Sequence, residues 1–428
     1  MGLGIYIGAR ISGRGLFGRM PKRDEVFGKI RTAIQDTVSD PLFRRLMAMT
    51  EKNGRLTVDL HPAEEGVEFF FNESGWLVCS AKTSSAGPGY HAFLVQLLDK
   101  VGTRCHLKWH WQDEENEFQD ETGYHEHRDF EELQMEMLQW LHGLAKMLLE
   151  RDGCLEFSLS LPMNFRVVGD YFAASTLGFW DRLWFEEVAH REVSQLSAHG
   201  AAFFPWFAEG HTTEFWLKCG LSLAWVDLPW HPPNSEDEKE RYRLALSCFT
   251  RAGELNPAIS LPRKEMEEIE TLLARPEVMA EPAAGRIGFK RRLMGQMLAG
   301  QWTIDLPGYF YSELEDEGRT AVFWFGGKTV RFTSFSVGNK DGKPVEAGGL
   351  LPAAGKGAAS HAEAIEFQKD RRIGRAFLSP PEADRSYWML QGHTQVDNHL
   401  SVTTVCFTEI TDKPWAIQTW QSVSLHAE

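Results

Sequence analysis

The chain has 428 residues, of which 43% are hydrophobic and 12% aromatic, so it can fill sizeable cores and is not mainly disordered. Its 60 acidic residues outnumber its 45 basic residues, and the formal net charge is −15. This charge repels nucleic-acid phosphates and anionic membranes, so we expect neither as a direct partner, whereas a cationic protein is attracted.

The first half of the chain alternates between strand-like and helix-like patterns. Period-2 or β-rich runs predict strands at 4–12, 55–60, 67–71 and 76–81, with a turn at 72–75. Apolar residues at steps of three and four predict helices at 24–38, 90–101 and 130–148. Further along, we expect a helix at 178–196, a strand at 213–226, and a helical pair at 241–273 that resembles a single tetratricopeptide-type repeat.

The last third of the chain has the pattern of an antiparallel β domain. A Pro/Ala-rich stretch at 274–285 predicts a linker, and hairpin turns are expected at Gly326-Gly327 and Asp397-Asn398. We also expect a helix at 358–369 and a final strand at 414–425. The prediction is an α+β protein with a mixed domain at 1–230, a helical connector and linker at 231–285, and a β-rich domain with one helix at 286–428.

Localisation follows from what the patterns lack. No run reaches the roughly 20 apolar residues of a membrane-spanning helix, and three arginines interrupt the amino-terminal segment where a secretory signal would be apolar. The six cysteines are scattered and form no C-x-x-C pair, which argues against a zinc ribbon and a disulfide framework. We expect a cytoplasmic protein.

Motifs for catalysis or cofactors are weak. Gly13, Gly15 and Gly18 match G-x-G-x-x-G, but Pro21 delays the helix that a dinucleotide site needs, and Gly357 stands where a P-loop has Ser or Thr. The chain has no G-x-S-x-G elbow and no H-E-x-x-H pair. We therefore expect no cofactor and no enzymatic activity.

One metal site remains open as an alternative. His125, His127 and Asp129 would project to one side of an extended segment and ligate a divalent metal, whose bound water would make the protein a hydrolase. Asp129 serves equally well as the N-cap of the helix predicted from Phe130. His393, Asp397 and His399 surround a predicted turn, which explains the aspartate more simply than catalysis does.

The most unusual stretch is DEENEFQDETGYHEHRDFEE, residues 113–132, with ten carboxylates and one arginine. A helix start explains the last three acids, because negative charge there complements the helix dipole. It does not explain the six that precede the helix: Asp113, Glu114, Glu115, Glu117, Asp120 and Glu121. These form either a solvated loop or a docking surface for a cationic partner, with Trp109, Trp111 and Phe118 as candidate anchors.

A second, smaller acidic loop has the same two interpretations. Its members are Glu313, Glu315, Asp316 and Glu317. We predict that both acidic stretches are partner-binding.

Four stretches together resemble immunity proteins that are encoded beside secreted antibacterial toxins, in particular nuclease effectors of the type VI secretion system. They are GIYIGARIS, GPGYHAFLVQLL, SELEDEGRTAVFWFGGKTVRFTSFSV and SYWMLQGHTQVDNHLSV. The resemblance implies a non-catalytic cytoplasmic protein that binds and blocks one toxin, whose active cleft is basic if it cuts DNA. The alternatives are the metal-dependent hydrolase and an assembly adaptor or chaperone that holds a peptide with the helical pair at 241–273.

Overall fold

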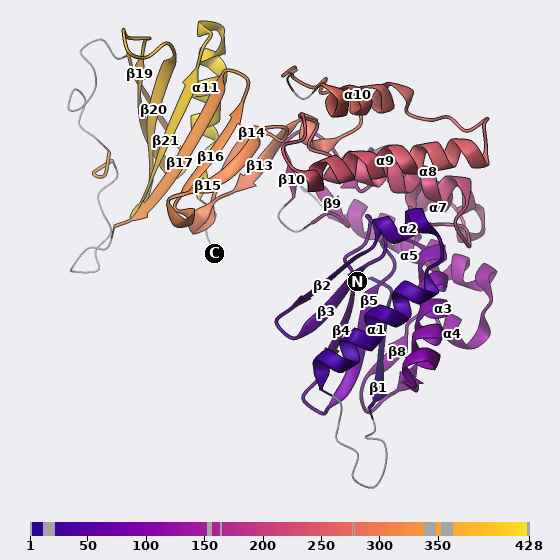
Figure 1. Ribbon diagram of the computed structural model, residues 1–428. Coiled ribbons are helices and arrows are strands. Elements are labelled where there is room, and N and C mark those ends of the chain that lie inside the picture. Colours follow the sequence, from indigo (N-terminus) through magenta and orange to yellow (C-terminus); the bar gives the residue numbers. More distant parts are fainter. Residues whose placement is uncertain are drawn as a thin grey trace. The chain divides into compact units, whose positions relative to one another are not determined.

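The computed structural model describes residues 2–11, 22–151, 156–162, 165–275, 277, 279–337, 348–351 and 363–425, and the chain forms two compact units (Figure 1). The N-terminal unit comprises residues 1–162, 170–228 and 234–270, and the C-terminal unit comprises 163–169, 229–233 and 271–428. Helices and antiparallel sheets occur together, which confirms the α+β class. Of the expected connector at 231–285, residues 234–270 belong with the N-terminal unit and 271–285 with the C-terminal unit.

An eight-stranded antiparallel sheet forms the centre of the N-terminal unit. Its order is β2-β3-β4-β5-β1-β8-β7, with β6 also beside β1. The strands are β1 (Gly4–Arg10), β2 (Ala48–Lys52), β3 (Arg55–Asp59), β4 (Val67–Phe71), β5 (Trp76–Lys82), β6 (Trp109–His110), β7 (Gln112–Asp113) and β8 (Phe118–Asp120). The strands expected at 4–12, 55–60, 67–71 and 76–81 are confirmed within one to two residues.

The two faces of this sheet are covered differently. On one face Phe27 of α1 (Arg23–Thr37) contacts Phe71, and α1 packs along α3 (Pro88–Cys105). On the other face Trp76, Val78 and Phe118 form a small apolar cluster with Tyr6. Gly8 is required beneath this cluster, because a Cβ at Gly8 would lie 2.2 Å from the Phe118 ring.

The remaining helices of the N-terminal unit are α2 (Pro41–Leu46), α4 (Tyr124–His127), α5 (Phe130–Glu150), α6 (Arg182–His190), α7 (Ser197–Phe203), α8 (Thr213–Ser222), α9 (Glu236–Leu255) and α10 (Arg263–Ala274). A three-stranded sheet of β9 (Phe157–Leu159), β11 (Ala173–Ser175) and β12 (Gly178–Trp180) and two short turns, η1 (Val193–Gln195) and the π-helical η2 (Leu223–Asp227), complete it. The helices predicted at 24–38, 90–101, 130–148 and 241–273 are confirmed. Helix α9 packs along α8 and also contacts α2.

One prediction in this region is wrong, the strand at 213–226, and another, the helix at 178–196, is confirmed only over 182–190. Residues 213–226 are helical rather than extended: Thr212 caps α8 by accepting a hydrogen bond from the Phe215 amide at 3.2 Å. Residues 178–196 begin as the strand β12, and α6 starts only after Asp181, whose side chain accepts from the Trp184 amide at 2.7 Å. In both places the aromatic composition concealed the polar cap that sets the helix start.

The C-terminal unit is built on a seven-stranded antiparallel sheet of order β15-β16-β17-β21-β20-β19-β18 (Figure 1). Its strands are β15 (Tyr311–Glu315), β16 (Thr320–Phe325), β17 (Lys328–Ser336), β18 (Glu363–Lys369), β19 (Arg372–Ser379), β20 (Trp388–Val396) and β21 (His399–Phe407). A four-stranded sheet contains β10 (Arg166–Val167), β13 (Leu293–Met297), β14 (Trp302–Pro307) and β22 (Ser424–Leu425), and short turns lie at η3 (Phe289–Arg291), η4 (Ala299–Gln301), η5 (Asp316–Gly318) and η6 (Ile410–Asp412). Both predicted hairpins are confirmed.

Helix α11 (Lys413–Ser422) closes the core of this unit. The fully buried Trp420 lies over Gly392 of β20, where a Cβ would come within 2.3 Å of the indole. The final strand expected at 414–425 is therefore wrong, because Pro414 starts a helix and only Ser424–Leu425 pair as a strand. The helix expected at 358–369 is also wrong over 363–369, which form β18; residues 358–362 lie outside the described residues.

None of the helices in the described part of the chain combines the length and hydrophobicity that a bilayer crossing demands.

A buried carboxyl group lies between β3 and β4 in the N-terminal unit. Glu64 accepts a hydrogen bond from the Leu60 amide at 3.1 Å, and its second oxygen is buried near Tyr90. Burial raises the pKa of Glu64 to about 7, against the opposing effect of the Leu60 amide hydrogen bond and of the nearby Tyr90 hydroxyl. Because the folded state holds this proton more tightly than the unfolded state, the stabilising effect of the protonated acid is complete below the unfolded pKa and is lost as the pH rises through 7.

We therefore predict that Glu64→Gln removes a loss of stability that the wild-type protein shows between pH 5 and pH 9. The difference in free energy of unfolding between variant and wild type should shift by roughly 2–3 kcal/mol in favour of the variant over this interval. Urea unfolding at pH 5, 7 and 9 measures it. The control is Glu65→Gln, because Glu65 is an exposed neighbour that pairs with Lys82 at 3.5 Å. For this variant the difference in free energy of unfolding from the wild type should not change with pH. If the free energies of unfolding of Glu64→Gln and the wild type changed equally with pH, the prediction would be contradicted.

Candidate functional site

The acidic run 113–132 begins as an ordered hairpin at the edge of the N-terminal sheet. Strands β7 and β8 pair, and β8 pairs in turn with β1 through Ile5–Asp120 and Tyr6–Gln119. The turn is held by Asp113, which accepts hydrogen bonds from the Asn116 amide (3.1 Å) and the Asn116 side chain (3.0 Å). The Asn116 side-chain bond lowers the pKa of Asp113. The first carboxylate of the run is thus partly used to form the turn.

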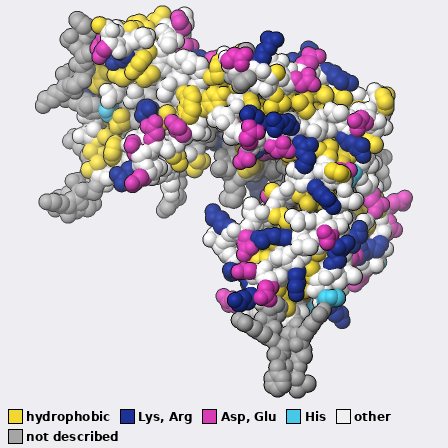
Figure 2. Space-filling view, in the orientation of Figure 1, with side chains coloured by type: hydrophobic (Ala, Val, Ile, Leu, Met, Phe, Trp, Pro, Cys, Tyr) yellow, Lys and Arg dark blue, Asp and Glu magenta, His cyan; other side chains and the backbone are white. Residues whose placement is uncertain are grey.

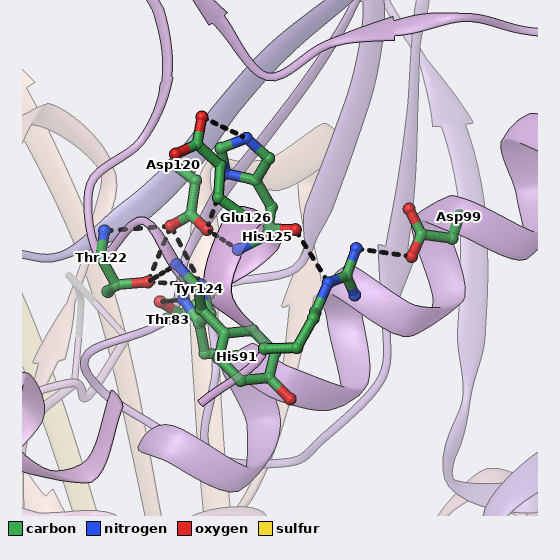
Figure 3. Close-up of polar contacts among 9 residues, drawn as sticks. Thr83, His91, Asp99, Asp120, Thr122, Tyr124, His125 and Glu126 are labelled. Carbon is green, nitrogen blue, oxygen red and sulfur yellow. Dashed lines mark hydrogen bonds and ion pairs between the residues drawn. The ribbon is translucent and has the colours of Figure 1, made fainter. Parts of the chain in front are cut away.

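Asp120 has a different role from its acidic neighbours, because its side chain is completely buried. One oxygen accepts from the Thr122 hydroxyl (2.8 Å) and amide (3.0 Å) and lies 3.1 Å from His91 Nε2; the other accepts from the His125 amide at 2.9 Å (Figure 3). Burial alone would raise the pKa of Asp120, but the hydrogen bond and charge of His91 with the two amides outweigh it and place the pKa well below the usual range. Asp120 is an internal anchor rather than a docking residue.

His91 links this anchor to the rest of the unit. Its Nδ1 lies 2.8 Å from the Thr83 hydroxyl, and its Nε2 lies 3.0 Å from the Thr122 hydroxyl (Figure 3). A hydroxyl, an imidazole and a carboxylate thus lie in series, as in nucleophilic enzymes. Here, however, Thr83 and His91 are both fully buried, so the series serves to hold α3 against β8.

Hydrogen bonds hold the segment 121–128 at its first residue, Glu121, and at its last, Arg128. Glu121 accepts a hydrogen bond from the Gly4 amide at 2.6 Å, while its own amide donates to the Gly4 carbonyl. The His125 ring stacks on Trp111, with ring centroids 5.0 Å apart and planes 10° apart. Arg128 donates to the His125 carbonyl and pairs with Asp99 at 2.8 Å, so the one arginine of the run is already engaged (Figure 3).

Together these elements surround an open hollow of about 890 Å³. Its acidic lining residues are Asp113, Glu114, Glu117, Asp120, Glu121 and Glu126, and its aromatic lining residues are Tyr6, Trp111, Phe118 and His125. Glu114 and Glu117 are exposed, and within the described residues neither makes an ion pair. The hollow offers carboxylates next to aromatic rings, the combination that recognises a guanidinium or ammonium group.

Of the six predicted residues, the hollow brings together Asp113, Glu114, Glu117, Asp120 and Glu121, but not Glu115. Of the predicted aromatic anchors, Trp109 and Phe118 are buried and only Trp111 is half-exposed in the lining. Sequence reasoning missed Tyr6 and Glu126. Tyr6 could have been found from the alternation of β1: Ile5 and Ile7 are buried on one face of the strand, so Tyr6 lies on the other face.

The arrangement expected for a metal site at His125, His127 and Asp129 is not formed. His125 and His127 lie on the single helical turn α4, where residues two apart point in nearly opposite directions. Asp129 is the N-cap of α5 and accepts from the Glu131 and Glu132 amides at 2.9 and 3.1 Å. Among the residues that the structure describes, no group of three or more ligand-type side chains converges.

The second acidic loop lies in the C-terminal unit and is partly neutralised. Glu315 forms a two-bond ion pair with Arg331, at 2.8 and 3.1 Å, and Asp316 accepts from the Thr320 hydroxyl at 3.0 Å. Glu317 lies 4.0 Å from Arg319, and Glu313 is exposed.

The remaining candidates carry no site. Asp397, at the tip of the β20–β21 hairpin, has a positive φ of +48° and pairs with Arg371, in keeping with a turn residue. His399 Nδ1 lies 3.0 Å from the Ser336 hydroxyl. The glycine motifs at 13–18 and 355–357 lie outside the described residues.

Negative charge is not spread evenly over the molecule. On the face of the N-terminal unit visible in Figure 2, Asp and Glu side chains alternate with Lys and Arg. The hollow differs because its lining contains six carboxylates and no Lys or Arg. A local concentration of carboxylates, rather than net charge alone, therefore distinguishes this site.

Comparison with protein-family models and with curated proteins finds no match for the chain.

We predict that Asp120→Asn destabilises the N-terminal unit by about 2–3 kcal/mol at pH 7, because the buried donors around it lose a charged acceptor. Folding lowers the pKa of Asp120, so its contribution is fully present above the unfolded pKa of about 3.9 and is lost progressively as the pH falls from there through the lower folded pKa. The deficit should thus shrink at pH 3. Urea unfolding at both pH values measures it, with Asp113→Asn as the control that should lose less. An Asp120→Asn deficit that is independent of pH would contradict the assignment.

Proposed function

We propose that this protein is a non-catalytic immunity protein that binds and neutralises a cationic antibacterial toxin, with the acidic hollow as the main contact. The observation that carries the proposal is the hollow itself: its exposed carboxylates lie beside Tyr6 and Trp111, above a buried hydrogen-bonded anchor. A function that required only solubility would not need a rigid, concave arrangement of acids.

The rigidity of the site favours binding over solvation. Holding like charges close together costs free energy, and the protein offsets this cost with turn hydrogen bonds at Asp113 and backbone bonds at Glu121. A partner that brings arginine or lysine removes the repulsion and gains charge-assisted hydrogen bonds. The site is therefore preorganised in the free protein, which lowers the free-energy cost of ordering these side chains on binding.

The nature of the partner follows from charge and from the resemblance noted in the sequence. A nuclease that acts on DNA has a basic cleft, and carboxylates in the hollow would take the place of phosphates there. The net charge of −15 would in addition speed encounter with such a partner at low ionic strength. Both effects weaken with added salt.

Co-expression with the product of the neighbouring gene tests the function. We predict that cells making both proteins survive, and that Glu114→Lys with Glu117→Lys weakens the complex about tenfold or more, mainly by slowing association and in a salt-dependent way. Growth assays and association rates at two salt concentrations measure this.

A matched control keeps the change of net charge the same. Glu115→Lys with Glu136→Lys alters two exposed acids that do not line the hollow, and should change affinity by less than about threefold. Continued killing of cells that make both proteins would refute the immunity function. An equal effect of the two double variants would refute the hollow as the contact.

A further inference from the structure

Within the described residues, the seven-stranded sheet of the C-terminal unit ends at β15, beyond which no further strand pairs. In the described residues β15 pairs only with β16, and Figure 1 shows it at the side of the sheet away from β19. Three successive residues of β15, Ser312, Glu313 and Leu314, are exposed. A strand with one covered face would alternate between buried and exposed, so both faces of β15 are bare here.

Leu314 is exposed, although the residues beside it on the next two strands are buried. The strand register places Leu314 opposite Ala321, which is opposite Phe332. Ala321 and Phe332 are 7% and 2% exposed, whereas Leu314 is 71% exposed. Among the described residues, nothing covers the apolar face of the sheet where it reaches this edge, and one more strand would extend it.

The charges at the edge indicate which strand fits. Glu315 points to the same face as its partner Arg331, so by alternation Glu313 lies on that face and Leu314 on the other. Glu313 makes no ion pair within the described residues, and Glu317 in the adjoining turn is 91% exposed. An added strand must bring an apolar side chain beside Leu314 and a cation beside Glu313.

A second copy of this chain does not meet that requirement. Two β15 edges paired antiparallel would bring the carboxylates of each copy against those of the other, and like charges opposite one another destabilise a sheet. Backbone pairing with an edge needs no particular sequence, so charge decides between occupants.

We propose that β15 is a strand-addition site that takes an extended segment of a cationic protein, with basic and apolar residues in alternation. Backbone hydrogen bonds to β15 provide the attachment, Leu314 gains an apolar neighbour, and Glu313 pairs with a basic side chain. This site goes beyond the acidic hollow of the N-terminal unit, and neither depends on the other.

The test uses the full chain and a synthetic peptide in which lysine alternates with valine. Fluorescence anisotropy should show saturable binding that Glu313→Lys weakens about tenfold. Glu317→Lys makes the same change of charge just outside the strand and should weaken binding less than threefold. Leu314→Thr, which keeps the β propensity but removes the apolar contact, should weaken binding without altering net charge.

Hydrogen exchange gives an independent readout. Peptide binding should slow exchange of the backbone amides at 312–315, a change that diffuse charge attraction would not produce. Absence of binding, equal effects of Glu313→Lys and Glu317→Lys, or unchanged exchange in β15 would overturn the proposal. A concentration-dependent dimer that Leu314→Thr disrupts would identify a second copy as the occupant and would also overturn it.

Discussion

The buried carboxylate of Asp120 is the constraint on which the acidic hollow depends. A charge taken out of water is tolerated only when hydrogen bonds replace its hydration, and here His91, Thr122 and the His125 amide do so. These contacts join α3 to the segment 120–125, which lies about 30 residues further along the chain. The backbone that carries the exposed acids Glu114 and Glu117 is thereby held against α3 and β1.

The same pattern of one engaged carboxylate beside free ones recurs at the second acidic stretch. Glu315 is neutralised by Arg331, Asp316 is bonded within its turn, and Glu317 lies 4.0 Å from Arg319, which leaves Glu313 without an ion pair among the described residues. In both stretches the protein assigns some acids to holding the backbone and others to the surface. Counting carboxylates in the sequence overestimates the charge that a partner meets.

Structural features could be predicted from the sequence where they depend on interactions between residues that are close in the chain. The Gly326-Gly327 hairpin and the N-cap at Asp129 were predictable because both follow from neighbouring residues. The helix at 213–222 was missed because most of its residues are buried, which hides the helical period, and the helix at 413–422 was missed because Trp415, Ile417 and Thr419 alternate as in a strand. The fate of Asp120 was not predictable, since its partner His91 lies 29 residues upstream and is brought close only by tertiary folding.

The short strand β10 limits how proteolysis can separate the two units. It pairs with β13 through Arg166–Gly295 and Val167–Met294, while the residues before and after it belong to the N-terminal unit. A protease that cut once in the Pro/Ala-rich stretch at 274–285 would leave the two partners of this pairing on separate fragments. The C-terminal fragment would then lack β10 of its four-stranded sheet, so a single nick would not release two complete units, despite the two cores.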